Sequence, residues 1–283
     1  KGSEFAFGWD YVTQMSKYHN IYLIYGVSED KIGETQTLID YFKEFPNPRI
    51  KLFPVKSNFI IRFLDYFNQI GLKLFWHLAF RIWHINAYTK SKTIINENNI
   101  DLIHTLNPQG FREPGYLFKL NKPHIWGPIG GANFVNKHLL KSISIPRRLP
   151  FLFRNFINHL QLKYSKRIQD SVLKSKYIVY STSANLSSFL KYHNCIGEVI
   201  SEMGIPISRF KFIKSKYAHG QMLRICWAGN ISTRKNLALL FKALDLCQNS
   251  EMIELNIIGD DNNKSAMRLK KYYYENKFKF NLI

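Results

Sequence analysis

Two hydrophobic patterns alternate along the chain, one typical of strands and one typical of amphipathic helices. Short apolar runs bounded by turn residues predict strands, and the segments between them repeat apolar residues with helical spacing. The predicted strands are residues 21–25, 50–55, 100–106, 124–126, 177–180, 223–228 and 252–258, and residues 198–206 are predicted to form a further strand and turn. The predicted helices are residues 4–17, 34–45, 58–96, 137–172, 181–190, 235–247 and a last one from Ser265. Strands that alternate with helices predict an α/β fold with parallel sheets.

The apolar periodicity stops between residues 206 and 221, and this break predicts a linker between two domains. A length of 283 residues also suits two domains better than one. We therefore expect an N-terminal domain over residues 1–205 and a C-terminal domain over residues 222–283. The second has two predicted strands, too few to bury a sheet on both faces, so it is expected to be incomplete. Because the first opens on K-G-S-E without Met, a preceding strand is also expected.

Residues 58–96 form an unusual helical segment in which aromatic residues recur throughout and single cations separate them. The charges recur too often for a membrane-spanning helix, which needs about 18 nearly uncharged residues. One interpretation is one or two amphipathic helices that close the sheet. The other is a basic aromatic face on a membrane surface, with Trp76, Trp83 and Tyr88 at headgroup level.

Charge narrows the class of partner without choosing one. Forty Lys and Arg against twenty Asp and Glu give a net charge of +20, which favours nucleotide phosphates or acidic lipid headgroups. No helix-turn-helix, zinc or ribonucleoprotein motif accompanies the charge, so nucleic acid is not an expected partner. The basic helical residues 137–172 are interpreted as a solvated face. The three cysteines, Cys195, Cys226 and Cys247, lie far apart in the sequence, which suits a reducing cytosol and provides no metal site. Cys226 is in a strand that is predicted to be buried.

The clearest candidate for anion binding is residues 223–236, L-R-I-C-W-A-G-N-I-S-T-R-K-N. An apolar run reaches a glycine, a polar turn with Arg234 and Lys235 follows, and a helical pattern then begins. Ser232 or Thr233 is expected to cap that helix. Backbone N–H groups at a helix start, beside two cations, suit a phosphate. The same pattern also fits an ordinary strand-to-helix connection with solvated side chains.

A second candidate lies in residues 123–133, P-H-I-W-G-P-I-G-G-A-N, where a predicted strand runs into a glycine-rich loop. Open α/β sheets bind ligands at the carboxyl ends of their strands, and glycines let the backbone approach a sugar or phosphate closely. Gly127, Gly130 and Gly131 are therefore candidate substrate-loop residues, although tight turns use the same residue types. His104 ends the preceding strand and is a candidate catalytic acid or base, but a lone histidine is more often structural.

Together these pieces resemble the glycosyltransferase family 4 enzymes, sugar transferases with two Rossmann-like domains of the GT-B type that are common in bacterial surface-polysaccharide assembly. The matching pieces are, in order, K-G-S-E-F-A-F-G-W, D-L-I-H, P-H-I-W-G-P-I-G-G, E-M-G-I-P, W-A-G-N-I-S-T-R-K-N and L-N-I-I-G-D. Each piece is weak by itself. The resemblance is based on their order and spacing across nearly the whole chain.

The resemblance implies a nucleotide sugar bound between two domains, with its diphosphate at the turn after the first strand of the second domain. There the family has Gly-Arg, four residues and Lys, and this chain has Gly229-Asn230, four residues and Lys235. Lys235 therefore matches, Asn230 replaces the family's Arg, and the adjacent Arg234 is a candidate substitute. Gly2 matches the family's glycine-rich loop that faces the same diphosphate.

The resemblance also implies transfer with retention of anomeric configuration and without a metal or other cofactor. The implied partners are a nucleotide sugar, a lipid-linked or saccharide acceptor and an anionic membrane surface. A cytoplasmic protein at the inner face of the cytoplasmic membrane is therefore expected. On this interpretation Asp260 and Asp261 belong to a structural G-D turn and not to a metal site.

Two departures from the family pattern leave two hypotheses open. Many members have a His in the loop where this chain has Gly127-Pro128-Ile129-Gly130-Gly131, and the family's Glu, seven residues, Glu motif is expected beyond Ile283. The first hypothesis is a retaining transferase of the hexosyltransferase type. The second is a truncated, non-catalytic relative that keeps acceptor or membrane binding but lacks donor binding.

Overall fold

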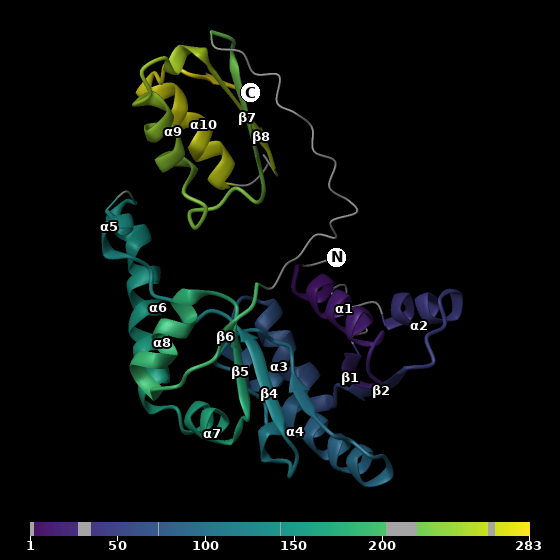
Figure 1. The fold of residues 1–283 in the computed structure, drawn as a ribbon. Coiled ribbons are helices and arrows are strands. Elements are labelled where there is room, and N and C mark those ends of the chain that lie inside the picture. The colour runs from purple at the N-terminus through teal and green to yellow at the C-terminus, as the bar shows by residue number, and fades with distance from the viewer. Residues whose placement is uncertain (1–2, 28–34, 73, 142, 202–219, 260–263) are drawn as a thin grey trace. The chain divides into compact units, whose positions relative to one another are not determined.

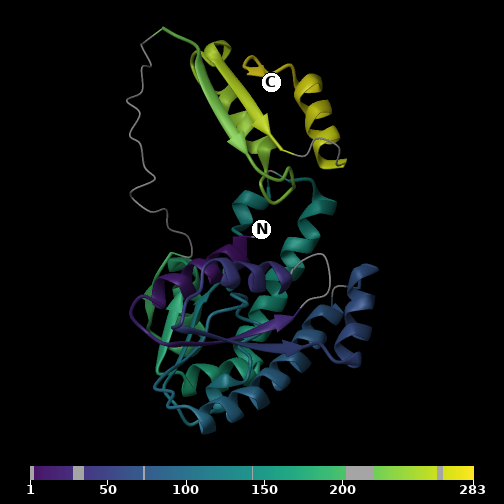
Figure 2. The same cartoon turned by 90° about the vertical axis from the view of Figure 1, so that its right-hand side faces the viewer.

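The computed structural model describes residues 3–27, 35–72, 74–141, 143–201, 220–259 and 264–283. The chain divides into two compact units, and Figures 1 and 2 show the elements of each. The first unit comprises Lys1–Phe134 and Ile157–Gly204, and the second comprises Val135–Phe156 and Ile205–Ile283. The predicted linker lies outside the described residues except for Gly220 and Gln221, and the predicted domain limits stay a prediction.

The first unit contains two sheets in which every pairing is parallel. One sheet pairs β1 (Ile21–Val27) with β2 (Ile50–Lys56). The other has the order β3 (Ile103–Thr105), β4 (His124–Ile129), β5 (Tyr177–Tyr180) and β6 (Glu198–Val199). Parallel strands need a crossover between them, and helical segments supply it. The predicted α/β class with Rossmann-like units is confirmed, although β3 is shorter than the predicted strand over residues 100–106.

The helices of the first unit cover its sheets and connect its strands. They are α1 (Ser3–Met15), α2 (Thr35–Glu44), α3 (Phe59–Gln69), α4 (Leu74–Glu97), η1 (Leu117–Lys119), α7 (Lys166–Lys174) and α8 (Ser183–His193). α4 packs against β1 and β2, and α3 packs against α4. The interpretation of residues 58–96 as helices that close the sheet is therefore confirmed.

Trp83 attaches α4 to the sheet and does not form part of an outward aromatic face. Its indole Nε1 donates a hydrogen bond to the carbonyl oxygen of Val55 over 3.1 Å. A Cβ added to Gly26 would lie 3.4 Å from the same nitrogen, so the indole ring lies directly on β1. The hypothesis that places Trp83 at headgroup level is wrong, because its N–H is already used inside the protein. No helix in the described part of the chain is both long and apolar enough to cross a bilayer.

The predicted basic helical segment over residues 137–172 is three helices. They are α5 (Lys137–Leu140), α6 (Ile145–Tyr164) and α7. Arg148 closes the turn between the first two, because its Nε and Nη2 donate to the carbonyl oxygens of Ile143 and Lys141 at 2.5 and 3.0 Å. α6 begins in the second unit and ends in the first, so it is continuous across the division.

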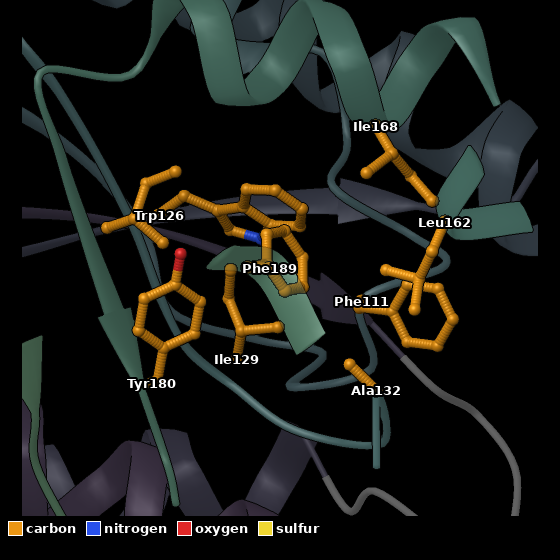
Figure 3. Close-up of a cluster of buried hydrophobic side chains, with 9 residues drawn as sticks. Phe111, Trp126, Ile129, Ala132, Leu162, Ile168, Tyr180 and Phe189 are labelled. Atoms are coloured by element: carbon orange, nitrogen blue, oxygen red, sulfur yellow. The ribbon is translucent and has the colours of Figure 1, made fainter. Parts of the chain in front are cut away.

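Aromatic side chains of β4, β5 and α8 form the centre of the first unit's core. Trp126 lies edge-on to Phe189, with ring centroids 5.7 Å apart, and Tyr180 lies 5.3 Å from the same phenyl ring (Figure 3). The complete cluster is Phe111, Trp126, Ile129, Ala132, Leu162, Ile168, Ile178, Tyr180 and Phe189. Because the cluster includes residues just after β3 and β4, the carboxyl ends of these strands are anchored in the core.

The second unit has a three-stranded parallel sheet, one strand more than predicted. Its strands are β7 (Leu223–Ala228), β8 (Ile253–Ile258) and β9 (Asn281–Leu282). Besides α5 and the start of α6, its other elements are α9 (Leu237–Asp245), η3 (Ser250–Met252) and α10 (Lys264–Asn276). The buried ring of Phe280 packs against Phe241 of α9, with centroids 5.4 Å apart. This packing brings the residues after Phe280 to the sheet, where the amide of Ile283 donates to the carbonyl of Leu255 over 2.9 Å.

Cys226 is exposed, and its predicted burial is wrong. Side chains on a strand alternate between two faces, and on β7 Ile225 and Trp227 pack into the core of the second unit. Cys226 lies between them and points to the other face. Since β7 is an edge strand of this sheet, that face is less covered than the apolar run suggested.

Candidate functional site

Gly127 lies inside β4 and not in the predicted loop after it. Its φ of +132° is disfavoured for other residues, and an added Cβ would lie 2.2 Å from the carbonyl oxygen of Val179 on β5. The register between β4 and β5 shifts between Trp126 and Ile129. A glycine is therefore required at residue 127 so that two strands can approach each other.

Gly130 takes part in a backbone bridge at the end of β4. The amide of Gly130 donates to the carbonyl of Gln109 over 2.7 Å, and its carbonyl accepts from the amide of Phe111 over 3.1 Å. Gly131 adopts a φ of +76°, in the left-handed region. All three candidate substrate-loop glycines thus have a structural role, and their contact with a substrate stays a prediction.

Two buried asparagines that sequence reasoning missed hold the backbone after these glycines. Asn158 of α6 donates through Nδ2 to the carbonyls of Gly131 and Asn133 at 3.3 and 3.1 Å. Asn185 of α8 accepts from the amide of Ala132 over 2.9 Å. Each asparagine precedes a buried apolar residue by four positions, Leu162 for the first and Phe189 for the second. That spacing places the amides on the core side of their helices and is the signal that identifies them.

His104 is a neutral imidazole with one nitrogen already used. Its Nε2 lies 2.7 Å from the carbonyl oxygen of Gly127, and since a carbonyl only accepts, Nε2 carries the hydrogen. Burial lowers the pKa of His104, and the hydrogen bond to Gly127 opposes that effect only in part. The free position of the neutral ring is therefore Nδ1, which accepts hydrogen bonds. The catalytic role of His104 stays a prediction.

α1 lies over the carboxyl end of β3 beside His104. The ring of Tyr11 meets the imidazole edge-on, with centroids 5.1 Å apart. A Cβ on Gly8 would lie 2.6 Å from Nδ2 of Asn107, so Gly8 lets α1 pack closely on the loop that follows β3. Gly2, which matches the family's glycine-rich loop, lies outside the described residues.

His124 is part of a buried hydrogen-bonded chain at the start of β4. Ser175 donates from Oγ to the carbonyl of Ser171 over 2.6 Å, so it accepts from Nδ1 of His124 over 2.9 Å. Nε2 then accepts from the hydroxyl of Thr105 over 2.9 Å. Burial, together with the neighbouring His104, lowers the pKa of His124 to about 4, so the ring is neutral.

We expect acid to destabilise the first unit through its buried histidines. Burial lowers the pKa of His84 to about 4 as well, so both His84 and His124 stay neutral in the folded chain where the unfolded chain binds protons. Their contribution to stability is complete above the unfolded pKa of about 6.5 and is lost as the pH falls toward 4. Between pH 7.5 and 5 each histidine is expected to remove about 2 kcal/mol from the free energy of unfolding.

Urea unfolding at the two pH values measures this loss. His124→Gln is expected to reduce the difference between the two pH values, whatever it does to stability at pH 7.5. His138→Gln, on an exposed side chain of α5, is the matched control and is expected to leave the difference unchanged. A pH dependence that is the same with and without His124 would contradict this account.

In the second unit, two glycines meet at the carboxyl ends of β7 and β8. Gly229 adopts a φ of +153°, and its amide donates to the carbonyl of Ile258 over 2.9 Å. A Cβ added to Gly259 would lie 2.5 Å from the carbonyl oxygen of Gly229. Ile231 is buried against Leu237 and thereby holds the following turn on the start of α9. The edge of the sheet is thus a narrow backbone surface, of the kind that α/β folds present to ligands.

Arg234 and Lys235 are exposed in the turn between Gly229 and α9. The amide of Lys235 donates to the carbonyl of Ser232 over 3.0 Å, which closes the turn before the helix begins. The predicted cap is wrong: Asn236, in the left-handed conformation at φ 47°, is the N-cap residue, and its side chain makes no capping hydrogen bond. The helix starts late because the Ser232–Lys235 turn already uses the residues expected to cap it.

Asn230 is exposed beside the same glycine, so the described members of the predicted diphosphate set lie within one turn. Neither Arg234 nor Lys235 makes an ion pair with another residue in the described ranges. Asp260 and Asp261 lie outside those ranges. The arrangement provides two exposed cations and a close backbone surface at one edge of a sheet, which together suit a doubly charged anion.

No protein-family model and no curated protein matches this chain. Among solved structures, the chain is similar to the apo form of the lipopolysaccharide outer core galactosyltransferase WaaB, with 13% sequence identity and a TM-score of 0.46. The similarity covers 93% of this chain and 66% of that galactosyltransferase. The chain therefore spans about two thirds of the length of that protein, and we base its function on its own residues.

Proposed function

We propose that this chain belongs to a glycosyltransferase that moves a sugar from a nucleotide-diphosphate sugar to a lipid-linked or saccharide acceptor in surface-polysaccharide biosynthesis. The observation that carries the proposal is the turn after β7, where exposed Arg234 and Lys235 follow the paired glycines 229 and 259. Lys235 also has the spacing from Gly229 that the family resemblance requires. A diphosphate is the anion that suits this turn.

The proposed chemistry uses these cations at the leaving group. Cleavage of the bond between sugar and phosphate develops negative charge on the leaving diphosphate and positive charge at the anomeric carbon. Lys235, with Arg234 in place of the missing family Arg, would neutralise the diphosphate as that charge develops. Preorganised charges of this kind lower the barrier without reorganising water. Transfer with retention of configuration and without a metal is part of the proposal.

The first unit is proposed to bind the acceptor beside the carboxyl ends of β3 and β4. Since Nε2 of His104 is used by Gly127, Nδ1 is the nitrogen that can accept a hydrogen bond from an acceptor hydroxyl. The lowered pKa of His104 keeps that nitrogen unprotonated at neutral pH. A lipid-linked acceptor also places the protein at the inner face of the cytoplasmic membrane, where a net charge of +20 favours an acidic surface.

Calorimetric titration with UDP and GDP tests the proposal. We expect one of the two nucleotides to bind the purified chain and Lys235→Ala to weaken that binding by about ten- to a hundredfold. The reason is that a hydrogen bond to a charged group contributes about 1.5–3 kcal/mol. Lys242→Ala removes an exposed lysine of α9 beyond the turn and is expected to leave the affinity within about twofold.

Two results would count against the donor site. An absence of heat with both nucleotides would favour the non-catalytic relative over the transferase. Equal weakening by Lys235→Ala and Lys242→Ala would show that the nucleotide responds to net charge and not to the turn. Arg234→Ala tests the contribution of Arg234 separately from that of Lys235. An unchanged affinity would show that Arg234 does not substitute for the family's Arg, which Asn230 replaces in this chain.

A further inference from the structure

The first three turns of α6 carry an exposed apolar stripe. Ile145, Leu149, Leu152 and Phe156 follow one another at intervals of four, three and four residues, which places them on one side of the helix, with Phe153 beside them. All five side chains are between 42% and 69% exposed. The stripe is therefore an outward face, in a segment that the sequence pattern indicated to be simply solvated and basic.

The stripe lies in the most basic and least acidic part of the chain. No Asp or Glu occurs between Glu113 and Asp170. The charged residues of the α5–α6 segment are all cations, at Lys137, Lys141, Arg147, Arg148, Arg154 and Lys163. At about 100° per residue, Arg147 and Arg154 lie on the side of α6 opposite the stripe. A helix with one apolar side and cations on the other side is complementary to the surface of an acidic lipid bilayer, where acyl chains lie beneath anionic headgroups.

Side-chain hydrogen bonds to the backbone hold α6 and the turn before it in place. Asn155 of α6 holds Val135 through both backbone groups, accepting from its amide at 3.0 Å and donating to its carbonyl at 3.0 Å. Arg148 holds the turn before α6 by its two hydrogen bonds to backbone carbonyls. Binding therefore does not require the helix to fold, and the entropy cost of ordering it is already met.

α3 carries a similar exposed apolar stripe, and the charges of the two helices decide which stripe suits an acidic membrane. Phe59, Phe63, Tyr66 and Ile70 repeat at four, three and four residues and are between 52% and 78% exposed. However, α3 contains one cation, Arg62, and one acid, Asp65, so its charges cancel. An apolar face on a helix without net positive charge gains no attraction to acidic headgroups.

We propose that residues 145–156 of α6 lie in the plane of an anionic membrane surface, with the stripe at the boundary of the acyl chains and the cations among the headgroups. The stripe is about 18 Å long at 1.5 Å per residue, which suits a helix lying on a surface. The inference rests on the proposed function in one respect, that the acceptor lies at the membrane. The lipid contact itself does not require sugar transfer.

Sedimentation with vesicles tests this surface in the full chain. The probes are vesicles of equal parts phosphatidylcholine and phosphatidylglycerol, and vesicles of phosphatidylcholine alone. F153S/F156S is expected to weaken binding to the acidic vesicles by at least tenfold, because each phenyl ring loses its burial in lipid. F59S/F63S removes two similarly exposed rings from α3 and is the matched control, with an expected change of less than twofold.

The cations of the segment have their own test. Arg147→Gln removes an exposed cation from the side of α6 opposite the stripe and is expected to weaken binding to the acidic vesicles by about fivefold, without affecting binding to phosphatidylcholine vesicles. High salt is expected to weaken binding of the unchanged chain in the same way. Equal binding to both vesicle types would overturn the electrostatic part of the proposal.

Three results would overturn the proposed surface: equal losses from both phenylalanine pairs, a loss from the α3 pair alone, or dissociation of a dimer by F153S/F156S without vesicles. The last would assign the stripe to a second copy of the chain. Nucleotide titration of F153S/F156S separates this question from the transferase proposal. If F153S/F156S keeps UDP or GDP binding but loses vesicle binding, the result supports the proposed membrane surface. If the unchanged chain binds vesicles but neither nucleotide, the result contradicts only the transferase proposal.

Discussion

Replacing Glu113 with alanine is expected to lower the free energy of unfolding of the first unit by about 3–5 kcal/mol, because the change leaves the largely buried guanidinium of Arg167 without its carboxylate. Glu113 is 2% exposed in the loop between β3 and η1. Its Oε2 lies 2.7 Å from Nη2 of Arg167 on α7, and its Oε1 lies 2.9 Å from Nδ1 of His77 on α4. One carboxylate therefore joins two helices to the loop that leads away from β3.

The ionised form of Glu113 is the one that the fold needs. Burial by itself raises the pKa of this carboxyl, but the hydrogen bond from His77 and the charge of Arg167 outweigh burial and lower the pKa below its usual range. Its contribution to stability is therefore present above the unfolded pKa of about 4.3 and is lost as the pH falls through the lower folded value. Urea unfolding followed by tryptophan fluorescence at pH 7 measures the effect of Glu113→Ala.

Asp170→Asn is the matched control for this prediction. Asp170 lies one turn from Arg167 on the same helix, and its carboxylate pairs with Lys166 over 2.8 Å at the surface. Surface pairs of this kind contribute little, because water screens both partners. We expect no resolved change in the midpoint of unfolding for this control. A midpoint shift as large as that of Glu113→Ala would show that burial does not decide the effect.

Gly127→Ala is expected to destabilise the first unit by at least about 3 kcal/mol or to prevent its folding. The added methyl group would lie 2.2 Å from the carbonyl oxygen of Val179, and that oxygen belongs to the neighbouring strand and has no room to move. The φ of +132° adds conformational strain to the clash. Soluble yield and the urea midpoint of the purified variant provide the measurements.

Gly110→Ala provides the comparison for the same substitution in the same unit. A Cβ at Gly110 meets nothing within 4 Å, and Gly110 is not among the glycines at positive φ. We expect a change within about 1 kcal/mol, of either sign, because only the entropy of the unfolded chain is affected. If Gly127→Ala were as harmless as this control, the close approach of β4 and β5 would not depend on a glycine.

The order of strands and helices was predictable because each element has its own local pattern. The apolar runs of β1, β2, β5, β7 and β8 are short and bounded by turn residues, and each was expected close to where it lies. The exposed cations Arg234 and Lys235 were also placed correctly between a strand and a helix. Patterns of this kind depend on neighbours within one turn or one strand, and a single sequence contains them in full.

The contacts that shape the candidate site depend on residues far apart in the chain. Glu113 has its partners on α4 and α7, and no local pattern connects those segments. Gly127 looked like a ligand loop because a glycine after an apolar run has the same sequence signature whether a substrate or a neighbouring strand approaches it. The third strand of the second unit was missed for the same reason, since it depends on the packing of Phe280 against Phe241.

The hydrogen bonds made by Asn155 and Asn158 give α6 a fixed phase. The first amide holds Val135 and the second holds Gly131 and Asn133, so both must face the same strip of backbone from neighbouring turns. Each residue of an α-helix advances its side chain by about 100°. One inserted residue between the two asparagines would rotate one amide away from that strip, whereas substitutions on the opposite side leave the phase intact. In a library of single-residue insertions, variants with an insertion between residues 155 and 158 should therefore be absent from the folded fraction. Substitutions on the opposite side of the same helix should be tolerated.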